Sequence, residues 1–228
     1  MDRLQKQFEA IGAEFAESAA DLSKRMARVR AFVFDWDGVF HDGRKSEVSR
    51  GSFSEADSMG TNMLRFGHYL GLGEIPFTGI ITGLQQPAAF ELSKREYFNA
   101  VYYGFGHKVD ALRHLTSTYG IYPEEIAFVF DDILDLSMAR ECGFRLCVRR
   151  QASPLFLDYV REEGIADYIT GTSSGLHPVR EVCELMLGLS GRFRDTISQR
   201  ERYTSVYQEY LGLRRQQVPA FYTKENLG

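Results

Sequence analysis

Asp35 and Asp37 are the residues of this chain best placed to do chemistry. They close the segment FVFDWDGV, residues 32–39, in which an apolar run ends in two carboxylates and a glycine. Side chains alternate along a strand, so both carboxylates can face one pocket only if the strand ends there and Gly38 lets the backbone turn. Open α/β sheets bind ligands at the carboxyl edge of their strands, so two acids there indicate a Mg²⁺ site or an acid/base pair. A polar turn after a buried strand is the alternative that this segment alone leaves open.

Two later apolar runs lead to residues suited to binding an anion. FTGII, residues 77–81, is followed by Thr82 and Gly83, which offer a hydroxyl and a backbone N–H. The run that starts at Val101 leads to Lys108, directly before the apolar periodicity of a helix. Taken singly, Thr82 is expected to cap a helix and Lys108 to be a solvated surface charge.

A third run ends in adjacent carboxylates. IAFVF, residues 126–130, delivers Asp131 and Asp132, and Asp135 lies three residues further on. Like charges placed side by side repel unless a cation compensates them. This cluster therefore favours a site over a plain turn.

Apolar runs and helical patterns alternate along the whole chain. Besides the runs above, short strands are expected at 144–148 and 167–170, and helices at 59–70, 87–94, 109–119, 133–141, 155–163 and 178–189. Strands that alternate with helices predict a mostly parallel sheet with helices on both faces.

The length of 228 residues suits a single domain, 1–228, with a core over about 25–190. Apolar residues at helical spacing predict one amphipathic helix within 1–29. A Gly-, Ser- and charge-rich stretch at 40–53 predicts a short flap hairpin over the site. We expect 191–228 to form a helical extension with an aromatic stripe, ending in a tail that is either disordered or reaches a neighbouring subunit.

Charge and hydropathy exclude two classes of partner. A net charge of −4 gives no electrostatic footprint for nucleic acid. The first thirty residues carry several acids and no long apolar run, so neither a signal peptide nor a membrane span is expected. The cytoplasm is the expected location.

The ordered set Asp-Xaa-Asp, Thr, Lys and Asp-Asp resembles the four signature motifs of the haloacid dehalogenase (HAD) superfamily, in that superfamily's order. A response-regulator receiver uses similar residues in a different order. The resemblance implies a Rossmann-like fold, and the second aspartate, Asp37, is typical of the phosphatase branch.

The intervals between Asp35, Thr82 and Lys108 are too short for an inserted cap domain, so the chain resembles the capless group. Within it, residues from about 25 to 190 resemble the phosphatases of 3-deoxy-manno-octulosonate 8-phosphate and of N-acylneuraminate 9-phosphate. Those relatives are Mg²⁺-dependent and tetrameric, which implies Mg²⁺, a small phosphorylated sugar acid and a homo-oligomer, a tetramer by resemblance. Leu84 departs from the arginine that follows Thr-Gly in them, and Phe130 departs from a glycine.

The resemblance also implies roles in catalysis. Asp35 would attack phosphorus to form an aspartyl phosphate, and Asp37 would act as general acid and then as general base. Mg²⁺ would be held by the carboxylates of Asp35 and Asp131 and by the backbone carbonyl of Asp37.

The remaining motif residues would bind the phosphoryl group or support the site. Thr82, the Gly83 N–H and Lys108 would hold phosphoryl oxygens. Asp132 and Asp135 would position Lys108 or a metal-bound water.

Two alternatives to a sugar-acid phosphatase stay open at this point. An open capless site would admit a macromolecular or another small phosphoester substrate. The substitutions at Leu84 and Phe130 also suit a non-catalytic regulatory or scaffold protein that retains the fold.

Overall fold

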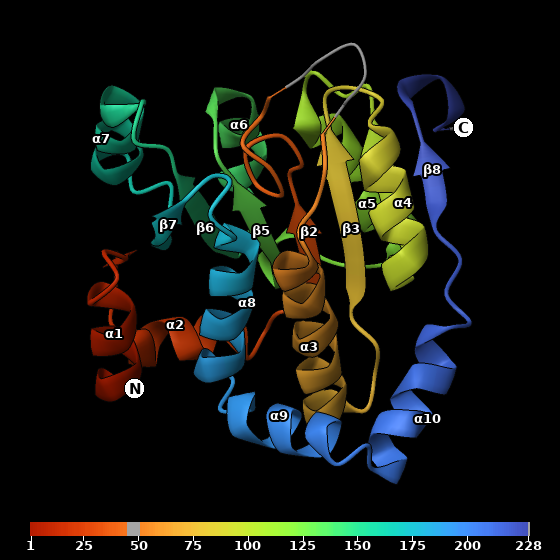
Figure 1. The fold of residues 1–228 in the computed structure, drawn as a ribbon. Helices are drawn as coiled ribbons and strands as arrows, with labels where there is room; N and C mark the ends of the chain where they lie inside the picture. The colour runs from red at the N-terminus through yellow and green to blue at the C-terminus, as the bar shows by residue number, and fades with distance from the viewer. Residues whose placement is uncertain (45–50, 228) are drawn as a thin grey trace.

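Within the described residues, 1–44 and 51–227, an eight-stranded sheet of order β1-β7-β6-β5-β2-β3-β4-β8 forms the centre of this computed structural model (Figure 1). The strands are β1 (Glu14–Phe15), β2 (Ala31–Phe34), β3 (Phe77–Thr82), β4 (Ala100–Tyr103), β5 (Ile126–Phe130), β6 (Phe144–Arg149), β7 (Tyr168–Ser173) and β8 (Ala220–Tyr222). All strand pairs are parallel except β1 with β7. The mostly parallel sheet expected from the sequence is confirmed.

Helices cover both faces of this sheet. They are α1 (Asp2–Glu9), α2 (Ala19–Met26), α3 (Glu55–Leu72), α4 (Pro87–Glu96), α5 (Lys108–Tyr119), α6 (Leu136–Ala139), α7 (Pro154–Glu162), α8 (Pro178–Leu189), α9 (Phe193–Glu201) and α10 (Ser205–Arg214), with 3₁₀ turns η1 (Pro123–Glu125), η2 (Ile133–Asp135) and η3 (Lys224–Asn226). The helix expected at 133–141 is shorter than predicted, because its first turn is η2.

The two helical layers explain why the central strands are apolar throughout. Every residue of β2 and β5 is buried. Alternate residues of β2 face opposite cores: Phe34 packs in the core formed with α3 and α8, and Val33 in the core formed with α5 and α6. A parallel sheet covered on both faces needs such continuous apolar runs.

The N-terminal segment is not the single helix expected within 1–29. The first helix ends at Glu9, Gly12 has a φ of +93° in the turn that follows, and residues 14–15 then pair with β7. Ser18 starts α2 by accepting the Asp21 N–H. The spacing of apolar residues did not separate the two short helices, because both of them have the same helical spacing.

The C-terminal segment contains the expected helices and one strand that was not expected. After α9 and α10, residues 220–222 run parallel to β4. Tyr222 stacks on Tyr102 at 4.9 Å between ring centroids, and Phe221 contacts Phe90 edge to face. The prediction of a disordered tail or a neighbour-reaching arm is therefore wrong for residues 220–222, which complete the chain's own sheet.

No inserted domain covers the carboxyl edge in the described part of the chain. Between β2 and β3 the described residues form only α3, and between β3 and β4 only α4. The tip of the expected flap hairpin, 45–50, lies outside the described residues. The flanking residues 40–44 and 51–54 contain one isolated bridge, between Asp37 and His41. None of the helices in the described ranges combines the length and the apolar character of a membrane span.

Candidate active site

The four sequence motifs meet at one edge of the sheet. Strands β5, β2, β3 and β4 are neighbours in that order and parallel. Asp35 follows the end of β2, Thr82 ends β3, Lys108 begins the helix after β4, and Asp131 follows β5. Parallel strands have their carboxyl ends on one edge, so the topology alone brings these residues together.

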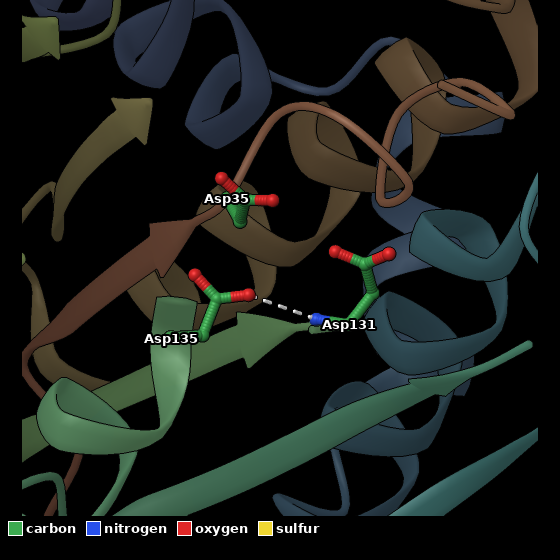
Figure 2. A group of neighbouring side chains, drawn as sticks. All are labelled: Asp35, Asp131 and Asp135. Atoms are coloured by element: carbon green, nitrogen blue, oxygen red, sulfur yellow. Dashed lines mark hydrogen bonds between the residues drawn. The ribbon is translucent and has the colours of Figure 1, made fainter. Parts of the chain in front are cut away.

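Asp35, Asp131 and Asp135 form the centre of the site. All three side chains are buried, and one carboxylate oxygen of each lies within 4.8 Å of the others. Figure 2 shows them arriving from the ends of β2 and β5 and from η2. Lys108, also buried, forms ion pairs with both Asp35 and Asp135.

Burial and mutual repulsion perturb the pKa values of these groups. Desolvation raises the pKa of Asp35 well above its usual value, against the opposing effect of Lys108. Desolvation likewise raises the pKa of Asp131 to about 6. Burial alone would lower the pKa of Lys108, but the charges of Asp35 and Asp135 hold it above its usual value. Burial therefore favours the neutral form of both carboxyl groups, whereas the two acids beside Lys108 favour its charged form.

The loop after β2 turns as the sequence predicted. Gly38 has a φ of +86°, and the N–H groups of Val39 and Phe40 donate to the Trp36 carbonyl. Trp36 is buried and stacks on Phe40 at 5.1 Å. The bulky residue between the two aspartates is thus an anchor for the loop.

Asp37 is half-buried and held by residues that the sequence did not single out. Nε2 of Gln86 donates to both of its carboxylate oxygens, at 3.1 and 3.3 Å. Nε2 of His41 lies 3.1 Å from Oδ1 of Asp37. Gln86 belongs to the loop after β3, so it ties the Thr82 motif to Asp37.

Thr82 and Gly83 lie at the rim beside β2. The Thr82 side chain is buried, and its Oγ1 accepts the N–H of Leu84 at 3.5 Å. Leu84 itself is 56% exposed. An apolar side chain therefore stands at the position that the sequence comparison marked as a departure.

The two remaining acids differ in position. Oδ2 of Asp135 accepts the backbone N–H groups of Asp131 and Asp132, at 3.2 and 3.1 Å, while its other oxygen faces Lys108. Asp132 is exposed, and its Oδ1 accepts the N–H of Ile133. The structure brings Asp135 to Lys108 and leaves Asp132 outside the buried cluster.

Arg150 is a site residue that the sequence reasoning missed. It follows β6, the neighbour of β5, and its guanidinium forms an ion pair with Asp131. The strand expected at 144–148 ends one residue earlier than β6, so Arg150 did not stand out as the residue that follows the strand.

The chemistry of the site fits a small divalent cation. Within the described residues, three buried carboxylates, those of Asp35, Asp131 and Asp135, form ion pairs with two cationic side chains, Lys108 and Arg150. Carboxylate oxygens are the donors that Mg²⁺ prefers. A Cβ atom at Gly38 would collide with the Asp131 carboxylate, so the glycine lets the first loop close over this oxygen.

Solved structures place the chain in a family. No protein-family model matches the sequence. A probable YrbI family phosphatase from Pseudomonas syringae is 30% identical, with a TM-score of 0.65 over 78% of this chain and 96% of that one. The chain belongs to the YrbI family of phosphatases. A HAD superfamily hydrolase of subfamily III A from Legionella pneumophila, 25% identical with a TM-score of 0.66, covers 80% of this chain and 94% of its own, which confirms the HAD resemblance.

Two further relatives are named for their substrate. The 3-deoxy-D-manno-octulosonate 8-phosphate phosphatase KdsC of Escherichia coli K12 is 27% identical over 181 residues, which are 79% of this chain and 91% of KdsC. The corresponding enzyme of Moraxella catarrhalis, solved with a magnesium ion, a phosphate ion and a KDO molecule, is 28% identical with a TM-score of 0.65, over 78% of this chain and 97% of that one.

Proposed function

We propose that this YrbI family phosphatase is a Mg²⁺-dependent phosphomonoester hydrolase that works through an aspartyl phosphate on Asp35. The observation that supports the proposal is that the buried side chains of Asp35, Lys108 and Asp131 lie together at the carboxyl edge of the sheet. A carboxylate there is fixed in direction, and a phosphate monoester needs positioning and charge neutralisation more than a strong nucleophile.

Asp35 and Asp37 would carry the covalent steps. An oxygen of Asp35 forms a bond to phosphorus while the bond to the leaving oxygen breaks, and Asp37 donates its proton to that oxygen. Water then attacks the aspartyl phosphate, Asp37 takes the proton of that water, and inorganic phosphate leaves. Gln86 holds the Asp37 carboxylate in place for both proton transfers.

The other site residues would bind charge. The carboxylates of Asp35 and Asp131, with the Asp37 carbonyl, would hold Mg²⁺, which when bound supplies charge neutralisation for a phosphoryl oxygen. Thr82, the Gly83 N–H and Lys108 would bind the remaining phosphoryl oxygens. Asp135 positions Lys108 through their ion pair.

The proposed substrate is a phosphorylated sugar acid, such as 3-deoxy-manno-octulosonate 8-phosphate or a nonulosonate 9-phosphate. The support is the likeness to KdsC and to the Moraxella enzyme over most of their length. A homo-oligomer, a tetramer by resemblance, and a cytoplasmic location belong to the same proposal. So does a single domain over 1–228, because α10 packs on α3 and β8 pairs with β4.

One observation favours a second candidate, a phosphoester with a larger leaving group. Leu84, Ile133 and Leu134 are exposed in the loops that follow β3 and β5 at the carboxyl edge. These side chains could contact an apolar part of a bigger substrate.

The experiment is a hydrolysis assay on the purified chain with and without Mg²⁺. We expect p-nitrophenyl phosphate hydrolysis that EDTA abolishes and Mg²⁺ restores, and that falls at least about a thousandfold in Asp35→Asn. A phosphometabolite panel that includes both sugar acids and a bulky apolar phosphoester then decides between the two substrate classes. No Mg²⁺-dependent turnover on any ester would overturn the proposal and favour the non-catalytic alternative.

A further inference from the structure

Arg150 occupies a place that the proposed function does not explain. Its guanidinium Nη2 donates to Oδ2 of Asp131, the carboxylate proposed to hold Mg²⁺. The Arg150 side chain is 31% exposed, whereas that of Asp131 is 1% exposed. The ion pair therefore joins the buried carboxylate of Asp131 to a guanidinium that is partly exposed to solvent.

The guanidinium also has an unused donor. Within the part of the chain that the structure describes, Nε of Arg150 is buried and has no hydrogen-bond partner, although a buried N–H normally has one. The neighbouring Arg149 differs, because its Nε donates to the Thr170 carbonyl and its Nη2 pairs with Glu14 at 2.5 Å. Arg149 is thus engaged with β7 and β1, whereas the described residues leave the Nε donor of Arg150 unused.

The geometry beside Gly38 sets a limit on what Asp131 can bind. A Cβ atom on Gly38 would collide with both Oδ2 of Asp131 and Nη2 of Arg150, so the first loop closes directly over this ion pair. A divalent cation and a guanidinium on the same carboxylate oxygen would repel each other strongly at that distance. A cation that binds the Asp131 carboxylate therefore competes with Arg150.

We propose that Arg150 is a metal-responsive anion-binding residue: it neutralises Asp131 in the resting protein, and once a divalent cation takes that carboxylate it turns its Nε and Nη donors to an oxyanion of the substrate. The inference rests on the proposed Mg²⁺-dependent function. A guanidinium group suits the role, because two of its N–H groups can donate parallel hydrogen bonds to one phosphate or carboxylate. Among the described residues, this movement breaks the ion pair with Asp131, and Nε has no hydrogen bond to lose.

The proposal makes opposite predictions for metal and substrate. Without the competing guanidinium, Arg150→Gln should bind Mg²⁺ about five- to tenfold more tightly than the wild type. At saturating Mg²⁺ the same variant should raise KM for an anionic phosphoester about tenfold, with kcat changed much less. Arg150→Lys keeps the positive charge but loses the paired N–H donors of the guanidinium. Its KM should therefore lie between those of the wild type and of Arg150→Gln.

The experiment measures Mg²⁺ binding without turnover. Melting temperature and the fluorescence of Trp36, the single tryptophan, are followed against MgCl₂ for wild type, Arg150→Gln, Arg150→Lys and the matched control Arg149→Gln. Arg149→Gln removes the same charge from the adjacent residue and should leave the Mg²⁺ dissociation constant unchanged.

The outcomes separate this inference from the proposed function. Tighter Mg²⁺ binding in Arg150→Gln alone, with raised KM, supports it. Equal or weaker binding in Arg150→Gln overturns it, and if hydrolysis in all four forms still depends on Mg²⁺, the proposed function stands without it. Absence of any Mg²⁺ effect on all four forms overturns both.

Discussion

The Nζ atom of Lys108 donates to Oδ1 of Asp35 at a point where both side chains are nearly excluded from solvent. This ion pair joins the first residue of α5 to the residue that follows β2. Asp135 forms the second ion pair of Lys108, so one ammonium group serves two buried carboxylates. Removing either partner of such a pair leaves a buried charge uncompensated.

Lys108→Met should therefore cost stability as well as activity. We expect the free energy of unfolding to fall by about 3–5 kcal/mol, because Asp35 and Asp135 lose their common cation. The double variant Lys108→Met/Asp35→Asn should be more stable than the single one, because one of the stranded charges is gone. Urea unfolding measures both.

The control for this cycle is a surface ion pair. Lys24→Met breaks the exposed pair with Asp21 and should leave the unfolding free energy almost unchanged. If Lys108→Met were as stable as Lys24→Met, the carboxylates would be compensated by another group and the Lys108 pairs would not matter for the fold.

The meeting of the four sequence motifs could be predicted from sequence because parallel strands end on one edge. Asp35 and Asp131 directly follow apolar runs, so counting to the end of the run was enough to place them, whereas Lys108 begins the helix after β4. Arg150 could not be placed by the same counting. The pairing of β6 with β7 shifts register between Cys147 and Arg149, and such a shift reverses the alternation that would assign Arg149 and Arg150 to faces.

The ends of the sheet were the least predictable part of the fold. β1 has two residues and β8 has three, too few for a period-two pattern to stand out from the helical spacing around them. Both strands are defined by their partners, β7 and β4, which lie far away in the sequence. Only tertiary pairing could reveal them.

Gly38→Ala should destabilise the protein and disable the site. The residue combines a φ of +86° with a Cβ position that collides with Asp131 and Arg150. We expect a loss of about 2–4 kcal/mol in unfolding free energy and loss of Mg²⁺-dependent hydrolysis. Gly73→Ala is the matched control, since Gly73 has a φ of +74° with nothing within 4 Å of its Cβ position.

Gly73→Ala should cost only about 1 kcal/mol and leave hydrolysis intact. Equal losses in the two variants would mean that backbone strain alone explains Gly38, and that the closeness of the loop to Asp131 has no consequence.

The pH dependence of metal binding follows from Asp131. Burial raises the pKa of this carboxyl from 3.8 to about 6. Protonation of Asp131 therefore stabilises the metal-free fold, and this effect is fully present below pH 3.8 and is lost as the pH rises through about 6. A cation at this carboxylate must displace the proton. Below the raised pKa, each bound Mg²⁺ therefore releases one proton from this group.

We expect Mg²⁺ to bind about tenfold more weakly at about pH 5 than at about pH 7, as measured by its effect on the melting temperature. Asp131→Asn should show little Mg²⁺ stabilisation at either pH. A dissociation constant that stays the same between the two pH values would show that Asp131 is already ionised at the lower one, against the burial that raises its pKa.

Part of the aromatic stripe of the C-terminal extension packs in the core, where Tyr207 and Tyr210 are buried. Tyr210 is 0% exposed, its ring lies 5.1 Å from that of Phe66, and its hydroxyl donates to the Asn62 carbonyl. Tyr210→Ala should lower the unfolding free energy by about 3–5 kcal/mol, because it leaves a cavity between α10 and α3. Tyr203 belongs to the same stripe but is 52% exposed, so Tyr203→Ala should cost less than about 1 kcal/mol. Similar small losses in both variants, measured by urea unfolding, would mean that α10 is held weakly and is free to pack against another subunit.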